Sequence, residues 1–190
     1  PSLDLMAEST VHHLSLSSDE LAGTDAKVNP PIRTATDRDR LWDAVSRDEV
    51  QTAVSDHAAI SREAKGDDIW SAWYGFGGTE LLLPALFTNG HVQRGISLGR
   101  IAEILSRAPA RYHGVSGRKG DIAIGWDADL AICDPSTPRT VDHRELHSAQ
   151  DFSPFDGQVL RGWVTTTILR GAVVYDSGEA VGAPTGRYIA

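Results

Sequence analysis

Cysteine is nearly absent from this 190-residue chain, which contains only Cys133. A single cysteine cannot form an internal disulfide, and it excludes a cysteine-rich zinc site. No apolar run approaches the roughly 20 residues that a membrane-spanning helix needs, and the amino end lacks the basic-then-apolar pattern of a signal peptide. We therefore expect a protein of a reducing, cytoplasmic compartment with no membrane partner.

Positive charge is also scarce. Lys and Arg total 18 against 26 Asp and Glu, which gives a formal net charge of −8, and the sequence has no block of basic residues. This argues against nucleic acid and anionic membrane surfaces as partners. The apolar content of 41% and the charged content of 23% are ordinary for a globular protein, and 190 residues can bury a sizeable core.

The first part of the chain alternates between strand-like and helix-like segments. Residues 3–7 alternate weakly between polar and apolar side chains and read as a buried strand, and residues 50–55 form a second apolar run. Between them, Thr36 followed by Asp39 predicts a capped helix start, and residues 37–50 carry apolar side chains at helical spacing. This order is typical of βα units around a parallel sheet.

Further along the chain the pattern becomes helical and then β-rich. Residues 79–89 read as an apolar helix with Gly90 as its carboxyl-terminal cap, and Ser97 is expected to cap a second helix. After residue 114 we expect short strands, with a hairpin at Arg170 and Gly171. The expected strands are residues 121–125, 128–133, 163–169 and 172–175.

The candidates for chemistry stand just past the two strands of the first part. His12 follows the first strand and Asp56 the second, and the carboxyl ends of parallel strands open on one face. Imidazole and carboxylate form a normal ligand pair for Zn²⁺. A hydrogen-bonded structural imidazole is the competing interpretation of His12, and His57 either orients Asp56 or touches substrate.

Other conspicuous residues have plainer interpretations. His13 is expected to pack or to face solvent, and Cys133 lies in an apolar run as an inert core thiol. Gly75, Gly77 and Gly78 lack the spacing of a phosphate-binding loop and predict a tight turn into a helix. The remaining histidines have no partners at ligand spacing and are expected at the surface or at helix caps: His91, His113, His143 and His147.

Several ordered stretches carry a resemblance to one family. They are Glu8–His12, Lys27–Arg33, Val54–His57, Ala72–Gly78, Arg118–Leu130, Ser153–Gly157 and Thr167–Gly171. Together they resemble the carboxyl-terminal part of the cyclic amidohydrolases, the group of allantoinase, hydantoinase and dihydroorotase. The resemblance spans nearly the whole chain.

The resemblance implies a fold and a reaction. The implied fold is α/β, with the carboxyl-terminal part of a (β/α)8 metal-dependent hydrolase barrel over residues 1–114. A small β-sandwich module with a carboxyl-terminal tail would follow over residues 115–190. The implied enzyme uses two Zn²⁺ ions to hydrolyse a C–N bond and open a cyclic amide or ureide ring.

The resemblance also implies roles for individual residues. His12 matches the last histidine ligand of the metal site, and Asp56 matches the aspartate that contacts metal and takes a proton from the bridging hydroxide. Asn29 and the backbone at Gly77 and Gly78 match positions that hold substrate. A carboxylate that shuttles a proton suits this chemistry, because amide resonance makes the carbonyl a poor electrophile.

The remaining metal ligands of the family pattern precede residue 1. We therefore expect a fragment or split half that holds part of the zinc ligand set. It would be inactive without a complementary amino-terminal half or a longer parent chain. A partial barrel exposes sheet edges and apolar helix faces, so a homo-oligomer, a dimer or tetramer, is expected.

The branch within the family is less sharply indicated. Val54–His57, Ala72–Trp73 and Ser153–Pro154 favour an allantoinase-like ureide hydrolase. Dihydroorotase is an alternative favoured by Asn29–Arg33, although Ile60 stands where that branch usually has a histidine. Hydantoinase or dihydropyrimidinase activity is a second alternative, and a non-catalytic assembly scaffold is a third.

Overall fold

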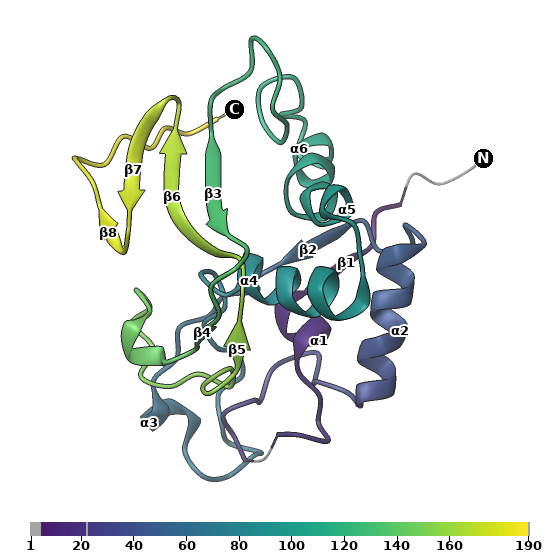
Figure 1. Cartoon of the computed structure of the whole chain (residues 1–190). Helices are drawn as coiled ribbons and strands as arrows, with labels where there is room; N and C mark the ends of the chain where they lie inside the picture. The colour runs from purple at the N-terminus through teal and green to yellow at the C-terminus, as the bar shows by residue number, and fades with distance from the viewer. Residues whose placement is uncertain (1–4, 22, 190) are drawn as a thin grey trace.

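The computed structural model describes residues 5–21 and 23–189. Its strands are β1 (Glu8–Thr10), β2 (Thr52–Val54), β3 (Leu130–Asp134), β4 (Arg139–Thr140), β5 (Val159–Leu160), β6 (Trp163–Leu169), β7 (Ala172–Asp176) and β8 (Glu179–Ala180). Its helices are α1 (Val11–Ser15), α2 (Ala35–Ser46), α3 (Arg62–Lys65), α4 (Leu82–Leu86), η1 (Phe87–Val92), α5 (Leu98–Ala102), η2 (Glu103–Arg107), α6 (Ala108–Tyr112) and η3 (His143–Glu145). In Figure 1, β1 and β2 lie between α2 on the right and α4 on the left, with α5 and α6 above them. The sheet of β3, β6 and β7 lies at the left of the view, on the side away from α2.

The strands β1 and β2 form a parallel pair, with α2 in the connection between them. The expected strand–helix–strand order is therefore present. The first strand begins later than the sequence predicted, at Glu8, where the Thr52 hydroxyl donates to the glutamate carboxylate at 3.2 Å. Residues 5–7 lie outside the strand and Leu5 is 77% exposed, so this apolar side chain is not part of a core. Residues 3 and 4 of the predicted strand lie outside the described residues.

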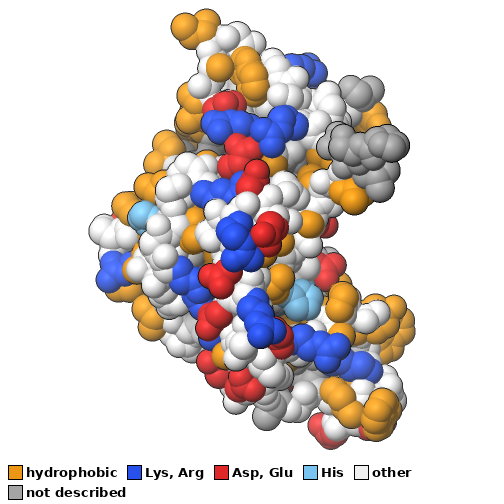
Figure 2. All heavy atoms as spheres, turned by 90° about the vertical axis from the view of Figure 1, so that its right-hand side faces the viewer, with side chains coloured by type: hydrophobic (Ala, Val, Ile, Leu, Met, Phe, Trp, Pro, Cys, Tyr) orange, Lys and Arg blue, Asp and Glu red, His pale blue; other side chains and the backbone are white. Residues whose placement is uncertain are grey.

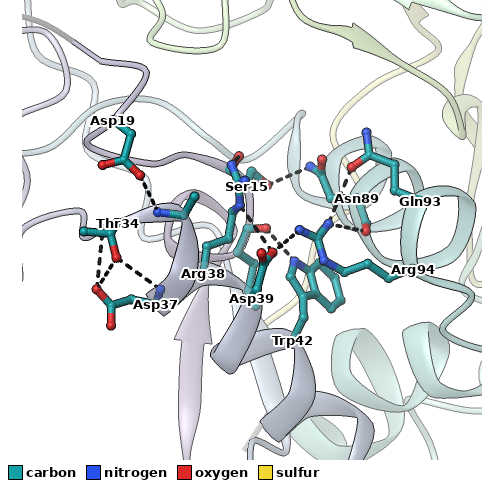
Figure 3. Close-up of polar contacts among 12 residues, drawn as sticks. Ser15, Asp19, Thr34, Asp37, Arg38, Asp39, Trp42, Asn89, Gln93 and Arg94 are labelled. Carbon is teal, nitrogen blue, oxygen red and sulfur yellow. Dashed lines mark hydrogen bonds and ion pairs between the residues drawn. The ribbon is translucent and has the colours of Figure 1, made fainter.

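The helix α2 begins two residues before its predicted start. Its N-cap is Thr34, whose hydroxyl accepts from the Asp37 backbone N–H while the Asp37 carboxylate accepts from the Thr34 N–H (Figure 3). The sequence predicted a cap with the same three-residue spacing, but two residues too late, at Thr36 and Asp39. The Asp19 carboxylate accepts from the Ala35 N–H at 2.8 Å, and this tertiary contact favours a helix that begins at Ala35.

The segment from α4 to α6 departs from the expected helix ends. α4 is continued by the π-helical turn η1, so Gly90 lies inside a helical segment and does not cap it. A Cβ at Gly90 would lie 2.5 Å from the Trp42 ring, and this close approach explains the glycine. Ser97 caps α5 as predicted, since its hydroxyl accepts from the Arg100 N–H.

The β-rich part contains a four-stranded sheet in the order β3-β6-β7-β8. The hairpin of β6 and β7 confirms the prediction of a turn at Arg170 and Gly171. The predicted strand at 121–125 is wrong: these residues are not in a strand, and Ile122 and Ile124 are 83% and 105% exposed. Cys133 in β3 is half-buried, so it is not the core thiol that was expected.

One core joins residues from both sides of position 114. Its buried members are Val11, Leu16, Val28, Phe76, Leu81, Ala85, Val141, Phe152, Phe155, Leu160 and Trp163. A second core lies between α1, α2, β2 and the helices after residue 80, and includes Leu14, Trp42, Leu86 and Ile104. The division into domains at residue 114 stays a prediction, and the shared core shows that the two parts pack against each other.

The face that carries α2 mixes charges of both signs. Figure 2 shows Lys and Arg side chains interspersed with Asp and Glu along this face. Ion pairs between Arg94 and Asp39 and between Arg100 and Asp48 contribute to the mixture. Over residues 5–21 and 23–189, no helix combines the length and the apolar character needed to cross a bilayer.

Candidate functional site

The site begins at the carboxyl end of β1, where α1 carries His12. Thr10 caps this short helix, because its hydroxyl accepts from the His13 N–H at 3.3 Å. The indole of Trp42 donates to the Leu14 carbonyl at 2.7 Å, and the Asn89 amide donates to the Ser15 hydroxyl at 3.1 Å (Figure 3). These contacts fix α1 between α2 and η1, so the position of His12 is set by long-range packing.

The structure brings His12 and Asp56 together, as the sequence predicted. His12 Nε2 lies 3.8 Å from Asp56 Oδ2, which is too long for a hydrogen bond. The His12 side chain is 1% exposed and the Asp56 side chain is 49% exposed, so the pair joins the buried interior to the surface. Asp56 has a φ of 47°, in the left-handed region that non-glycine residues adopt at a cost.

The electrostatics of His12 keep its ring neutral. Burial, reinforced by the neighbouring His13, lowers the pKa of His12 from 6.5 to about 3. Neither ring nitrogen of His12 has a hydrogen-bond partner among the described residues, although both are buried. Buried polar atoms are nearly always satisfied, so two orphaned imidazole nitrogens indicate a missing partner.

A metal ion fits the donors that the chain presents here. Neutral imidazole nitrogen and carboxylate oxygen are the ligand types of zinc sites, and His12 and Asp56 supply one of each. Within the described part of the chain, no three residues of the His, Cys, Asp and Glu types lie close enough to hold a metal ion. These residues therefore fit a part of a metal site and not a whole one.

His13 has a structural role, which agrees with the expectation that it packs. Because the Pro30 carbonyl can only accept, Nε2 donates to it at 3.1 Å, and Nδ1 of the neutral ring then accepts from the Thr10 hydroxyl at 2.6 Å. This bond attaches the loop that holds Asn29 to the end of β1. Asn29 is exposed, and its role in binding substrate stays a prediction.

The loop from Gly77 to Thr79 lies beside this site, and its backbone donors are already used. The Gly77 N–H donates to Gln150 Oε1 at 2.7 Å. The N–H groups of Gly78 and Thr79 both donate to His57 Nδ1, at 3.2 and 3.4 Å. The carbonyl oxygens of Gly78 and Thr79 also accept from the Leu81 and Leu82 N–H groups, at 3.2 and 3.4 Å, whereas the Gly77 carbonyl has no such bond within the described residues.

Glycine at position 78 allows the loop to approach the end of β2 closely. A Cβ there would lie 3.0 Å from the Ser55 carbonyl oxygen and 3.1 Å from a methyl group of Val11. The prediction of a tight turn into a helix is consistent with this geometry, because α4 begins four residues later, at Leu82. The predicted contact of Gly77 and Gly78 with substrate stays a prediction.

A cavity of about 310 Å³ is lined in part by this loop. Its lining includes His57, Glu80, His143 and His147, whereas Asp56 does not line it. His147 pairs with Glu80 at 3.0 Å, which raises the pKa of His147. Two surface histidines thus have carboxylate partners that the sequence did not reveal, since His143 also pairs with Asp156 at 2.7 Å.

Gln150 is the residue of this region that the sequence reasoning missed. It is 5% exposed, and its side chain donates to the Phe152 carbonyl at 2.6 Å while accepting from Gly77. A lone glutamine in a polar stretch gives no sequence signal. Only the packing of residues 148–153 against residues 57–79 reveals it.

The chain is similar in sequence and in fold to several known proteins. Residues 6–174 match the amidohydrolase family model. An allantoinase from Rubrobacter xylanophilus is 38% identical over 98% of the chain, and a dihydroorotase from Halobacterium salinarum is 38% identical over 96%. The structure of an L-hydantoinase (dihydropyrimidinase) from Arthrobacter aurescens superposes with a TM-score of 0.89 at 35% identity, over 94% of this chain and 41% of that one. The chain spans 42% and 43% of the length of the two curated relatives.

Proposed function

The chain belongs to the amidohydrolase family, and we propose that it forms part of a metal-dependent hydrolase that opens a cyclic amide or ureide ring. The observation that carries the proposal is His12, buried and with both ring nitrogens unpartnered, 3.8 Å from Asp56 at the carboxyl ends of a parallel strand pair. The α/β architecture and the likeness to hydantoinase structures support the carboxyl-terminal portion of a barrel as its fold. The remaining ligands would come from a complementary segment.

His12 and Asp56 would hold the metal, proposed as Zn²⁺ in a binuclear site. When bound, such a centre supplies a water of lowered pKa and polarises the amide carbonyl. His12 is suited to ligation because burial keeps its imidazole neutral. Asp56 is half exposed and would take a proton at its carboxylate and deliver it to the leaving ring nitrogen.

The loop at Gly77 and Gly78 would orient the substrate. Its N–H groups donate to Gln150 and His57 and the Gly78 carbonyl accepts from the Leu81 N–H, so the Gly77 carbonyl would accept from a ring N–H group. Cyclic ureides carry such N–H groups beside each carbonyl. Asn29, on the loop that His13 attaches to β1, is the second substrate contact that we propose.

We favour an allantoin-like ureide as substrate, with dihydroorotate and hydantoins or dihydropyrimidines as the alternatives. The relatives include an allantoinase, a dihydroorotase and a hydantoinase, all at similar identity. Turnover of allantoin, dihydroorotate and hydantoin by the purified protein, supplied with its complementary segment if it has one, would distinguish them. Chelation should abolish turnover and added Zn²⁺ should restore it.

The Asp56→Asn variant tests the mechanism directly. Loss of a general base should lower kcat by about 10²- to 10⁴-fold while the fold is retained. Asp48→Asn is the matched control, because Asp48 also has a positive φ, of 61°, and lies outside the site. An Asp56→Asn protein with the turnover of the unsubstituted protein would refute the assigned role. Absence of ring-opening activity in the complete protein would favour the assembly scaffold.

A further inference from the structure

The loop Gly77–Thr79 is held by two side chains that come from opposite directions along the chain. His57 stands 20 residues or more before it and accepts from both Gly78 and Thr79. Gln150 stands 73 residues after Gly77 and accepts from its N–H at 2.7 Å. Consecutive backbone donors are therefore fixed by side chains and not by the loop itself.

The Gln150 side chain is well suited to this task. It is 5% exposed, so its hydrogen bonds are shielded from competing water. Its Nε2 donates to the Phe152 carbonyl at 2.6 Å, and this bond sets the direction in which Oε1 points. Phe152 belongs to the core shared with Phe76, next to the loop, so the clamp is anchored in packed structure.

The His57 ring is oriented by the same contacts. Because Nδ1 accepts from two backbone N–H groups, the neutral ring carries its proton on Nε2. Backbone pairing between His57 and Phe76, with the Ala58 N–H donating to the Phe76 carbonyl at 3.1 Å, joins the two ends of the intervening segment. His57 is thereby bound to the loop through both its backbone and its side chain.

We propose that Gln150 and His57 are positioning residues, which hold the loop Gly77–Thr79 at the site by accepting its three N–H groups. This inference rests on the proposed function, since it assigns the loop to substrate binding. It also gives His57 a role different from the two that the sequence left open, which were orientation of Asp56 and contact with substrate. The carboxyl-terminal part of the chain contributes to the site through Gln150, although both proposed metal ligands precede it in the sequence.

Hydrogen exchange of the purified protein tests the clamp without any substrate. Gln150→Leu should speed exchange of the Gly77 amide by about tenfold or more, which corresponds to the loss of one net hydrogen bond. His57→Leu should do the same at Gly78 and Thr79. In His57→Asn an oxygen can still accept, so this variant should recover most of the protection, whereas Gln150→Glu loses the donor to the Phe152 carbonyl and should recover little. Unchanged exchange in the two leucine variants would overturn the inference.

Asp156→Asn is the matched control for disturbance of residues 143–157. It removes the carboxylate partner of His143 within the same segment, and among the described residues Asp156 has no hydrogen bond to the loop. We expect normal exchange at Gly77 in this variant. Equal loss of protection in Asp156→Asn and Gln150→Leu would mean general loosening and would overturn the specific role of Gln150.

Kinetics then separates positioning from chemistry. In the active protein, Gln150→Leu should raise KM by about tenfold with kcat changed less than about threefold. Lost protection at Gly77 with an unaltered KM would overturn the positioning role. Failure of the unsubstituted protein, supplied with its complementary segment, to open any cyclic amide would instead refute the proposed function, while the exchange data would still decide whether the clamp exists.

Discussion

Lys65 is fully buried, an unusual environment for a lysine. Its ammonium group donates to the Lys27 carbonyl at 2.7 Å and faces the rings of Phe76 and Phe152, each with its centroid 5.9 Å away. Burial lowers the pKa of Lys65 from 10.5 to about 8, with Asp25 opposing and Lys27 adding to the effect. The segment around Lys65 is therefore packed, although its sequence is polar.

Because of Lys65, the stability of the protein should depend on pH in the alkaline range. Between pH 8 and pH 10.5 the unfolded chain binds more protons at this lysine than the folded chain, so stability rises with pH across that window. The free energy of unfolding of the protein, relative to that of Lys65→Met, should therefore increase by about 3 kcal/mol from pH 7 to pH 10.5. Urea unfolding at the two pH values measures this difference. A difference that does not vary with pH would contradict the assignment.

The Lys65→Met variant is a clean probe because it leaves no buried acceptor unsatisfied. The Lys27 carbonyl also accepts from the Gly75 N–H at 2.9 Å, so one hydrogen bond to it remains. Methionine fills a similar volume and suits contact with the two aromatic rings. The fold should be retained, and the pH dependence can then be attributed to the missing ammonium group.

At the scale of single elements, the start of α2 offers a matched pair of variants. Thr34 forms the capping box with Asp37, whereas Thr36 lies in the first turn of the helix. Thr34→Ala should lower the free energy of unfolding by about 1 kcal/mol, and Thr36→Ala should change it by less than about 0.5 kcal/mol. Thermal or urea unfolding measures both. Equal losses of unfolding free energy in the two variants would contradict the assignment of Thr34 as the N-cap.

Two helical glycines should respond in opposite ways to alanine. Gly90 in η1 lies where a Cβ would be 2.5 Å from the Trp42 ring, so Gly90→Ala should destabilise by about 1–3 kcal/mol. Gly99 in α5 has its nearest neighbour 3.9 Å from the built Cβ. Gly99→Ala should therefore stabilise by up to about 1 kcal/mol through helix propensity. Urea denaturation of both variants measures these changes, and a stabilised Gly90→Ala would contradict the close contact between Gly90 and the Trp42 ring.

The elements also show what the sequence could predict. Local signals were sufficient for the cap at Ser97 and the hairpin at Arg170 and Gly171, because each depends on neighbouring residues. The cap of α2 was misplaced because Asp19, 16 residues away, favours the earlier frame. The strand expected at 121–125 failed because apolar residues need a partner strand and a core, and these isoleucines have neither among the described residues.

The candidate site also has features that the sequence could predict and features that it could not. His12 and Asp56 were predictable because each stands directly after a strand, and the parallel pairing brings their side chains to one edge. The unpartnered ring nitrogens of His12 and the clamp by Gln150 were not predictable. Both depend on contacts between segments far apart in sequence, which leave no local pattern.

At the scale of the whole molecule, the pair β1-β2 has outer edges that pair with no further strand within the described residues. Strands with unpaired N–H and C=O groups associate with other chains. We therefore expect the isolated chain to be oligomeric or poorly soluble, and to become monodisperse when a complementary segment supplies neighbouring strands. Sedimentation of the chain with and without that segment measures this. A monomer that unfolds cooperatively by itself would contradict the expectation.

The core that joins Val11 and Phe76 to Phe155 and Trp163 also bears on how the protein is made. During synthesis the strands and loops of the site leave the ribosome long before Gln150 and the aromatic residues that follow it. Since long-range contacts cannot form until both partners exist, the site loop should stay unordered until nearly the whole chain has been translated. A translation product that stops before residue 150 would therefore hold His12 and Asp56 without a completed site.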